Sequence, residues 1–110
     1  IEYPPTGTDL PAPRPGELLN YPNPFNPSTT LTLRLGDGDV SLAERDVALD
    51  IYSVSGQKVR ALFAGALRPG MSEIPWDGKD DGGSTVAAGV YFAVARTPNG
   101  VLERKMVLVR

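Results

Sequence analysis

Three aspartates fall close together in the stretch WDGKDDGGS, residues 76–84, and two kinds of chemistry could use them. Neighbouring carboxylates can bind calcium, or can act as a general acid and a general base. A calcium loop of the EF-hand type needs oxygen ligands at its first, third and fifth positions, followed by glycine. Counted from Asp77, the third position is Lys79, whose ammonium group repels a cation. Asp80 and Asp81 are adjacent and point apart on an extended backbone, so these aspartates are weak calcium candidates.

A different calcium geometry, in which Asp37 or Asp39 from another loop joins these carboxylates, stays open. The run GDGD, residues 36–39, does not form a calcium loop by itself. Counted from Asp37, the position that requires glycine is occupied by Leu42, and the twelfth position, which should be acidic, is occupied by Ala48. We expect this run to be a solvated turn.

The structural interpretation of residues 76–84 is a loop held in place by its own side chains. An aspartate shortly before glycine folds its carboxylate back onto backbone amides in an Asx turn, and the glycine supplies the positive φ that follows. We expect Trp76 to insert its ring into the core beside this loop.

The composition argues against catalysis. The chain contains no histidine and no cysteine. Histidine is the usual general base and the commonest transition-metal ligand, and without cysteine there is no thiol nucleophile or thiolate metal site. Carboxylates on a convex loop are not desolvated, so their acidity stays ordinary. We therefore expect no enzymatic activity and no cofactor.

With 110 residues, the chain can form one domain. The net charge is −2 and the eleven Lys and Arg residues are scattered, so no basic stripe is available to bind nucleic acid. Most of the eleven prolines lie in the first 27 residues. We expect residues 1–20 to be an extended, proline-rich linker and residues 21–110 to be the folded domain. Because the sequence begins with Ile1 and this linker, we also expect a cargo domain upstream.

Period-two alternation predicts strands along the folded part. It is clear in TTLTLRL, residues 29–35, and in VALDI, residues 47–51, whose leucine, valine and isoleucine side chains should face inward. In residues 58–63, Val59, Ala61 and Phe63 should do the same. Further strands follow in SEIPW, GVYFAVAR and VLERKMVLV, where Pro75 indicates an edge strand and Asn99-Gly100 a hairpin. Residues 36–44 should be a loop. The total of six or seven strands predicts two packed antiparallel sheets.

Two tyrosines on these strands raise the alternative of a carbohydrate-binding module. Tyr52 falls on the face opposite Ile51, and Tyr91 on the face opposite Val90. Aromatic side chains in an exposed row can stack on sugar rings, which would require Trp76 to join the two tyrosines. We favour the simpler interpretation, in which these aromatics cover the edge of the core.

Four stretches, in this order and spacing, resemble the carboxy-terminal sorting domain of type IX secretion and the related immunoglobulin-like domain of the flagellar hook-capping protein. The stretches are NYPNPFNPST (residues 20–29), VALDIYSVSGQKVRAL (47–62), WDGKDDGGSTVAAGVYF (76–92) and RKMVLVR (104–110). The resemblance implies an all-β fold, an immunoglobulin-like antiparallel β-sandwich of about seven strands. The positions that match the family motifs are Pro22, Asn23, Pro24, Gly70, Asp77, Asp80, Gly83, Gly89, Tyr91, Lys105, Met106, Val107, Leu108 and Val109.

The resemblance also implies a function as a non-catalytic export signal. Such a domain directs an upstream cargo across the periplasm and the outer membrane to the cell surface or the medium. Its partners are the outer-membrane secretion machinery and a surface peptidase, which would cut within residues 1–20. We expect Gly89 to mark a close approach of two backbones, and the last strand to be read by strand addition or carboxylate capture. A structural immunoglobulin-like spacer is the alternative, and an unpaired edge strand favours a weak homodimer.

Overall fold

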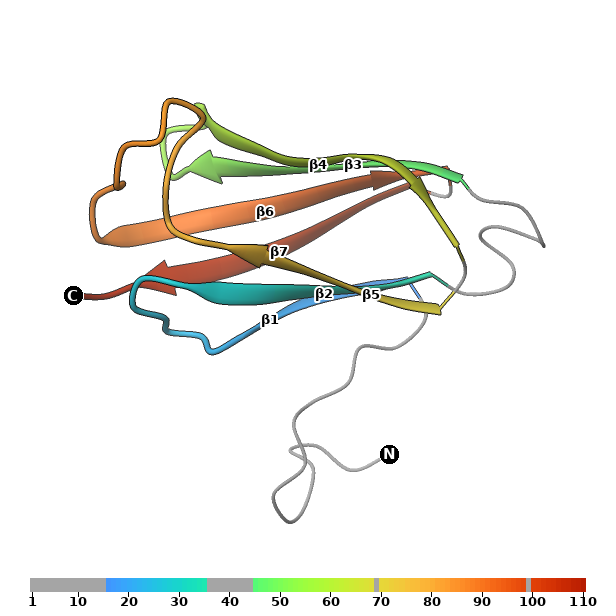
Figure 1. Ribbon diagram of the computed structural model, residues 1–110, viewed down its shortest axis with the longest axis horizontal. Helices are drawn as coiled ribbons and strands as arrows, with labels where there is room; N and C mark the ends of the chain where they lie inside the picture. The colour runs from blue at the N-terminus through green and yellow to red at the C-terminus, as the bar shows by residue number, and fades with distance from the viewer. Residues whose placement is uncertain (1–15, 36–44, 69, 99) are drawn as a thin grey trace, which may run out of the picture.

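The computed structural model describes residues 16–35, 45–68, 70–98 and 100–110. They form two antiparallel sheets packed face to face (Figure 1). The three-stranded sheet has the order β1 (Glu17–Tyr21), β2 (Thr29–Leu35), β5 (Gly70–Trp76). The four-stranded sheet has the order β4 (Lys58–Leu67), β3 (Arg45–Ser53), β6 (Gly89–Thr97), β7 (Gly100–Leu108). The predicted all-β sandwich of about seven strands is confirmed. Among these residues there is no helix long and apolar enough to cross a membrane.

The core lies between the two sheets and follows the predicted alternation. On β2 and β3 the side chains that alternate inward are almost fully buried, as expected: Leu31, Leu33, Leu35, Val47, Leu49 and Ile51. The β6–β7 hairpin is also confirmed, since Thr97 pairs with Gly100; Asn99 itself lies outside the described residues. Pro75 lies on β5, which is an edge strand as predicted.

The sandwich begins earlier than the expected boundary between residues 20 and 21. Strand β1 pairs antiparallel with β2 from Glu17 onward, and Leu18 is 4% exposed. The alternation was hard to recognise because the inward positions of this short strand are Leu18 and the polar Asn20. Residues 36–44, with the GDGD run, lie outside the described residues.

The predicted alternation along β4 is wrong after its first residues. Ala61 is exposed, whereas Leu62 and Phe63 both pack against the core. The register between β3 and β4 shifts at two places, so β4 carries extra residues that its partner strand does not match. A β-bulge of this kind turns neighbouring side chains to the same face and breaks the period of two.

Candidate functional site

Most of the segments that carry the family motifs gather at one end of the sandwich. In Figure 1 the β1–β2 connection, the loop after β5 and the carboxy end of β7 lie at this end. Gly78 brings two of these segments into contact. It has φ of +77°, and a Cβ there would lie 2.6 Å from the carbonyl oxygen of Pro27. Only glycine fits such a position. Our sequence analysis did not single out Gly78, although the WDG tripeptide contains it.

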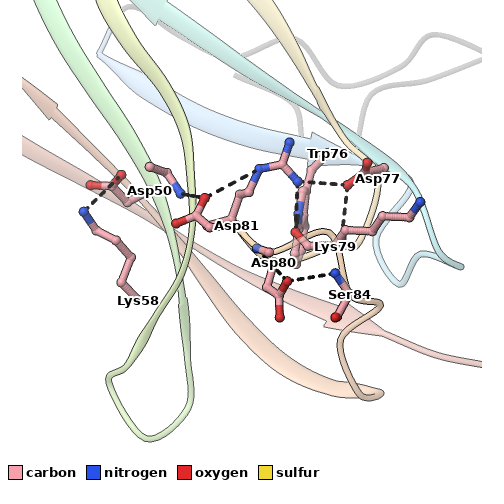
Figure 2. Close-up of polar contacts among 11 residues, drawn as sticks. Asp50, Lys58, Trp76, Asp77, Lys79, Asp80, Asp81 and Ser84 are labelled. Carbon is pink, nitrogen blue, oxygen red and sulfur yellow. Dashed lines mark hydrogen bonds and ion pairs between the residues drawn. The ribbon is translucent and has the colours of Figure 1, made fainter.

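The loop after β5, residues 77–86, is held by its aspartates and is called the aspartate loop below. One oxygen of Asp77 accepts a hydrogen bond from the N–H of Lys79 at 3.0 Å. One oxygen of Asp80 accepts from the N–H groups of Gly82 at 3.0 Å and Ser84 at 2.9 Å. These are the Asx turns that the sequence predicts. Figure 2 shows Asp80 bonded to Ser84 within the loop, whereas Asp77 and Asp81 both face the guanidinium group of Arg60.

Asp81 fixes the aspartate loop to the neighbouring edge strand. Its backbone N–H donates to the carbonyl of Val59 at 3.0 Å, and its carboxylate accepts from the N–H of Ala61 at 3.0 Å. The residue thereby occupies the position that a further strand would take beside β4. Within residues 16–35, 45–68, 70–98 and 100–110, no group of three acidic, histidine or cysteine side chains is placed to hold a metal. Asp37 and Asp39 lie outside these residues.

Arg60 joins β4 to the aspartate loop, and sequence reasoning missed it. Its guanidinium group lies 3.2 Å from the Asp77 carboxylate and 3.9 Å from that of Asp81, and it donates to the carbonyl of Lys79 at 3.0 Å. The indole N–H of Trp76 donates to the same carbonyl at 2.9 Å. Arg60 lies in the stretch VALDIYSVSGQKVRAL that resembles the family, but no local sequence pattern indicates that it binds Asp77, seventeen residues away.

The pKa of Asp77 differs from the ordinary value that we expected for carboxylates of this loop. A slight loss of hydration raises the pKa of the exposed Asp77, but the N–H of Lys79 and the positive charge of Arg60 outweigh this effect and lower the pKa below its ordinary 3.8. A carboxyl whose pKa is lower in the folded state stabilises the fold above its ordinary pKa. That contribution disappears as the pH falls through the folded-state value.

We predict that Asp77→Ala lowers the free energy of unfolding by about 1 kcal/mol, because it removes a turn hydrogen bond and the partner of Arg60. Chemical denaturation at neutral pH measures this loss. The difference between wild type and variant should shrink as the pH falls below the ordinary value of 3.8. Calcium and a chelator should leave both melting temperatures unchanged; a wild-type melting temperature that rises with calcium would contradict the turn interpretation.

Three aromatic rings support the aspartate loop from the core. Trp76 is fully buried, with its ring 5.6 Å from that of Phe25 and 5.7 Å from that of Tyr91. The hydroxyl of Tyr91 donates to the carbonyl of Ala87 at 2.6 Å. Trp76 is a core residue, as predicted, and Tyr91 also faces the core. Tyr52, in the same four-stranded sheet as Tyr91, is instead partly exposed on the outer face. The exposed aromatic row that a carbohydrate-binding module would require is therefore not formed.

Residues 22–26, which we call the strap, lie along the outer edge of β7. The side chain of Asn23 donates to the carbonyl of Lys105 at 3.2 Å and accepts from the N–H of Val107 at 3.0 Å. Phe25 continues this pairing with its backbone, from its N–H to the carbonyl of Val107 and from the N–H of Val109 to its carbonyl, both at 2.9 Å. The strap therefore takes the place of a parallel strand, and Phe25 anchors it in the core.

Asn20 holds the base of the strap. It is 5% exposed, and its amide donates to the hydroxyl of Thr29 at 3.1 Å and to the carbonyl of Pro22 at 3.3 Å. Its oxygen accepts from the guanidinium of Arg104 at 2.7 Å. Every polar atom of the Asn20 side chain is thus paired, and β1, the strap and β7 are joined by one residue that sequence reasoning did not identify.

The structure brings together most, but not all, of the residues matched to family motifs. At the strap it unites Pro22, Asn23 and Pro24 with Lys105, Met106, Val107, Leu108 and Val109. Asp77, Asp80 and Gly83 lie in the aspartate loop next to these. Gly70 pairs with Leu35, at the opposite end of β5 from Trp76.

Two expectations about these residues need correction. A Cβ built on Gly89 meets nothing within 4 Å, so no other backbone segment approaches this residue. Glycine is favoured here because φ is +152°, a conformation that residues with a side chain rarely adopt. The edge of β7 is also not free for strand addition over residues 105–109, because the strap already pairs with it. A receptor strand could use that edge only after displacing the strap.

This architecture and its capped edges define an immunoglobulin-like β-sandwich. The family model of the FlgD Ig-like domain matches residues 28–100, which is more than half of the chain. The chain therefore belongs to the FlgD Ig-like domain family. A comparison with curated proteins finds no match.

Two solved structures share the fold. One is PorZ, an essential bacterial surface component of the type-IX secretion system of Porphyromonas gingivalis, at 18% sequence identity and a TM-score of 0.56. The other is dimeric latent PorU from the same organism, at 22% identity and a TM-score of 0.58. Each match covers 84% of this chain but only 11% of the PorZ chain and 9% of the PorU chain. The sandwich thus corresponds to a small part of each of these proteins.

Proposed function

We propose that this sandwich is a non-catalytic sorting domain, which directs an attached cargo through the outer membrane by way of the type IX secretion machinery. The cargo then reaches the cell surface or the medium after passing through the periplasm. A surface peptidase is the second proposed partner, and the segment that it would cut is the part of residues 1–20 that precedes β1.

One observation carries this proposal: the strap and the end of β7, 82 to 84 residues apart in sequence, form a single surface. These are the two segments in which the resemblance to sorting domains is densest. Lys105 and Pro24 are exposed on this surface, and Val109 is 42% exposed. The fold shared with parts of PorZ and PorU supports the same assignment. A non-catalytic role is supported by the aspartates, whose oxygens accept hydrogen bonds from backbone N–H groups.

Membership in the FlgD Ig-like domain family favours a second candidate, a structural module that spaces or assembles other domains. The two candidates differ in what the isolated domain does to a foreign cargo. A sorting domain exports the cargo, whereas a structural module leaves it where it was delivered.

The test is an export assay in a host with a type IX system. Residues 1–110 are fused behind a periplasm-directed fluorescent protein, and the fluorescence in the medium and on the cell surface is measured. We expect the fusion to leave the periplasm. If it stays there while the domain is folded, the sorting function is wrong and the structural module is favoured.

A truncation of the last strand is a poor control, because Met106 and Leu108 are core residues and their loss would unfold the sandwich. A matched pair of point variants avoids this. Val109→Asp and Val101→Asp each add one negative charge at an exposed valine, 42% and 62% exposed respectively, on or just after β7. We expect Val109→Asp to retain the fusion in the periplasm and Val101→Asp to be exported like wild type. Equal melting temperatures would show that both variants fold.

A further inference from the structure

Most edges of the two sheets carry a feature that blocks pairing with another chain, as is usual for soluble β proteins. β5 contains Pro75 and Glu73 on its edge. β7 is covered by the strap, and β1 is tied to β7 through Asn20 and Arg104. The first half of β4 is capped by Asp81 and interrupted by two register shifts.

The second half of β4, residues 63–67, has none of these features. Its sequence FAGAL contains neither charge nor proline, and both register shifts lie before it. β4 ends its sheet, so no strand in the described part of the chain pairs with this outer edge. Ala64 and Ala66 are exposed, and Phe63 and Leu67 are only partly buried although they pack against the core.

The same five residues are complementary to themselves. In an antiparallel pair centred on Gly65, Ala64 lies opposite Ala66 of the partner subunit, and Phe63 lies opposite Leu67 of the partner subunit. Small side chains then meet small ones on the outer face, apolar ones meet on the core side, and no like charges face each other. Cross-strand pairs of these kinds stabilise antiparallel sheets.

We propose that residues 63–67 are a self-association edge, at which two copies of the chain pair their β4 strands about a two-fold axis. The two four-stranded sheets then join into one continuous sheet. A second copy is the favoured occupant because an isologous interface requires a surface that matches itself, and this segment does. Five residues a side bury far less than the roughly 1,200 Å² at the lower limit of standard interfaces, so the dimer is weak and depends on concentration. The proposal is independent of the export function.

The test is sedimentation equilibrium of the full chain over a wide range of protein concentrations. We expect the mean mass of wild type to rise toward that of a dimer. The double variant Ala64→Lys, Ala66→Lys places lysines opposite each other across the proposed pair, and it should weaken association at least tenfold. The double variant Ala64→Lys, Ala66→Glu places opposite charges there and should restore association to the wild-type level or beyond.

The matched control adds two lysines elsewhere, at Val54 and Val101, which are 74% and 62% exposed. It should associate like wild type, and denaturation curves should show that all variants fold. A monomeric wild type at every concentration would overturn the proposal. So would a double-lysine variant that associates like wild type, or a lysine–glutamate variant that does not recover.

Discussion

Replacing Trp76 by alanine is expected to lower the free energy of unfolding by about 4 kcal/mol, within the usual range for emptying a large aromatic site. Trp76 is fully buried, and its ring packs against those of Phe25 in the strap and Tyr91 in β6. Its indole N–H also donates to the carbonyl of Lys79 in the aspartate loop. The variant therefore leaves a cavity at the place where three segments meet. A domain of this size has only about 5–15 kcal/mol of stability to lose.

Chemical denaturation measures the loss, and Trp76→Phe is the control. Phenylalanine keeps an aromatic ring in the site but cannot donate to the Lys79 carbonyl, so we expect a smaller loss of about 1–2 kcal/mol. If Trp76→Ala changed the free energy of unfolding by less than about 1 kcal/mol, far below the range for a buried aromatic, Trp76 would not hold these segments together.

The parts of the fold that depend on local pattern could be predicted from the sequence. Alternation located β2 and β3, and turn residues located the β6–β7 hairpin. The Asx turns of the aspartate loop were also predictable, because Asp77 and Asp80 bind backbone groups only two to four residues away. In each case the residues that define the feature are neighbours in sequence.

The rest depends on contacts between distant segments. The bulge that buries Leu62 beside Phe63 is set by the register of β4 against β3, which no local alternation reveals. Arg60 and Asn20 are ordinary polar residues in sequence, and their importance comes from partners 17 and 84 residues away. Gly78 is required because the carbonyl oxygen of Pro27, in another loop, lies where the Cβ of any other residue would be. Such positions need the tertiary structure before they can be recognised.

The strap gives the second large prediction. Asn23→Leu is expected to lower the free energy of unfolding by about 1–2 kcal/mol, because leucine of similar size leaves the Val107 N–H and the Lys105 carbonyl without their partner. The matched control is Asn26→Leu, the same chemical change at an exposed position of the same segment. It should cost less than about 0.5 kcal/mol, as surface substitutions usually do.

Hydrogen exchange distinguishes two ways in which the strap could fail. Phe25 keeps its own backbone pairing with β7 and its place in the core, so removing the Asn23 side chain should open the edge only locally. We therefore expect the Val107 amide to lose protection in Asn23→Leu while the amides of β2 and β3, at the centre of the sandwich, keep theirs apart from the global loss. Unchanged protection at Val107 would mean that the Asn23 side chain does not hold the strap on β7. A uniform loss of amide protection across both sheets would instead mean that the strap opens only when the whole domain unfolds. In that case the folded protein could not expose the edge of β7 to a receptor strand.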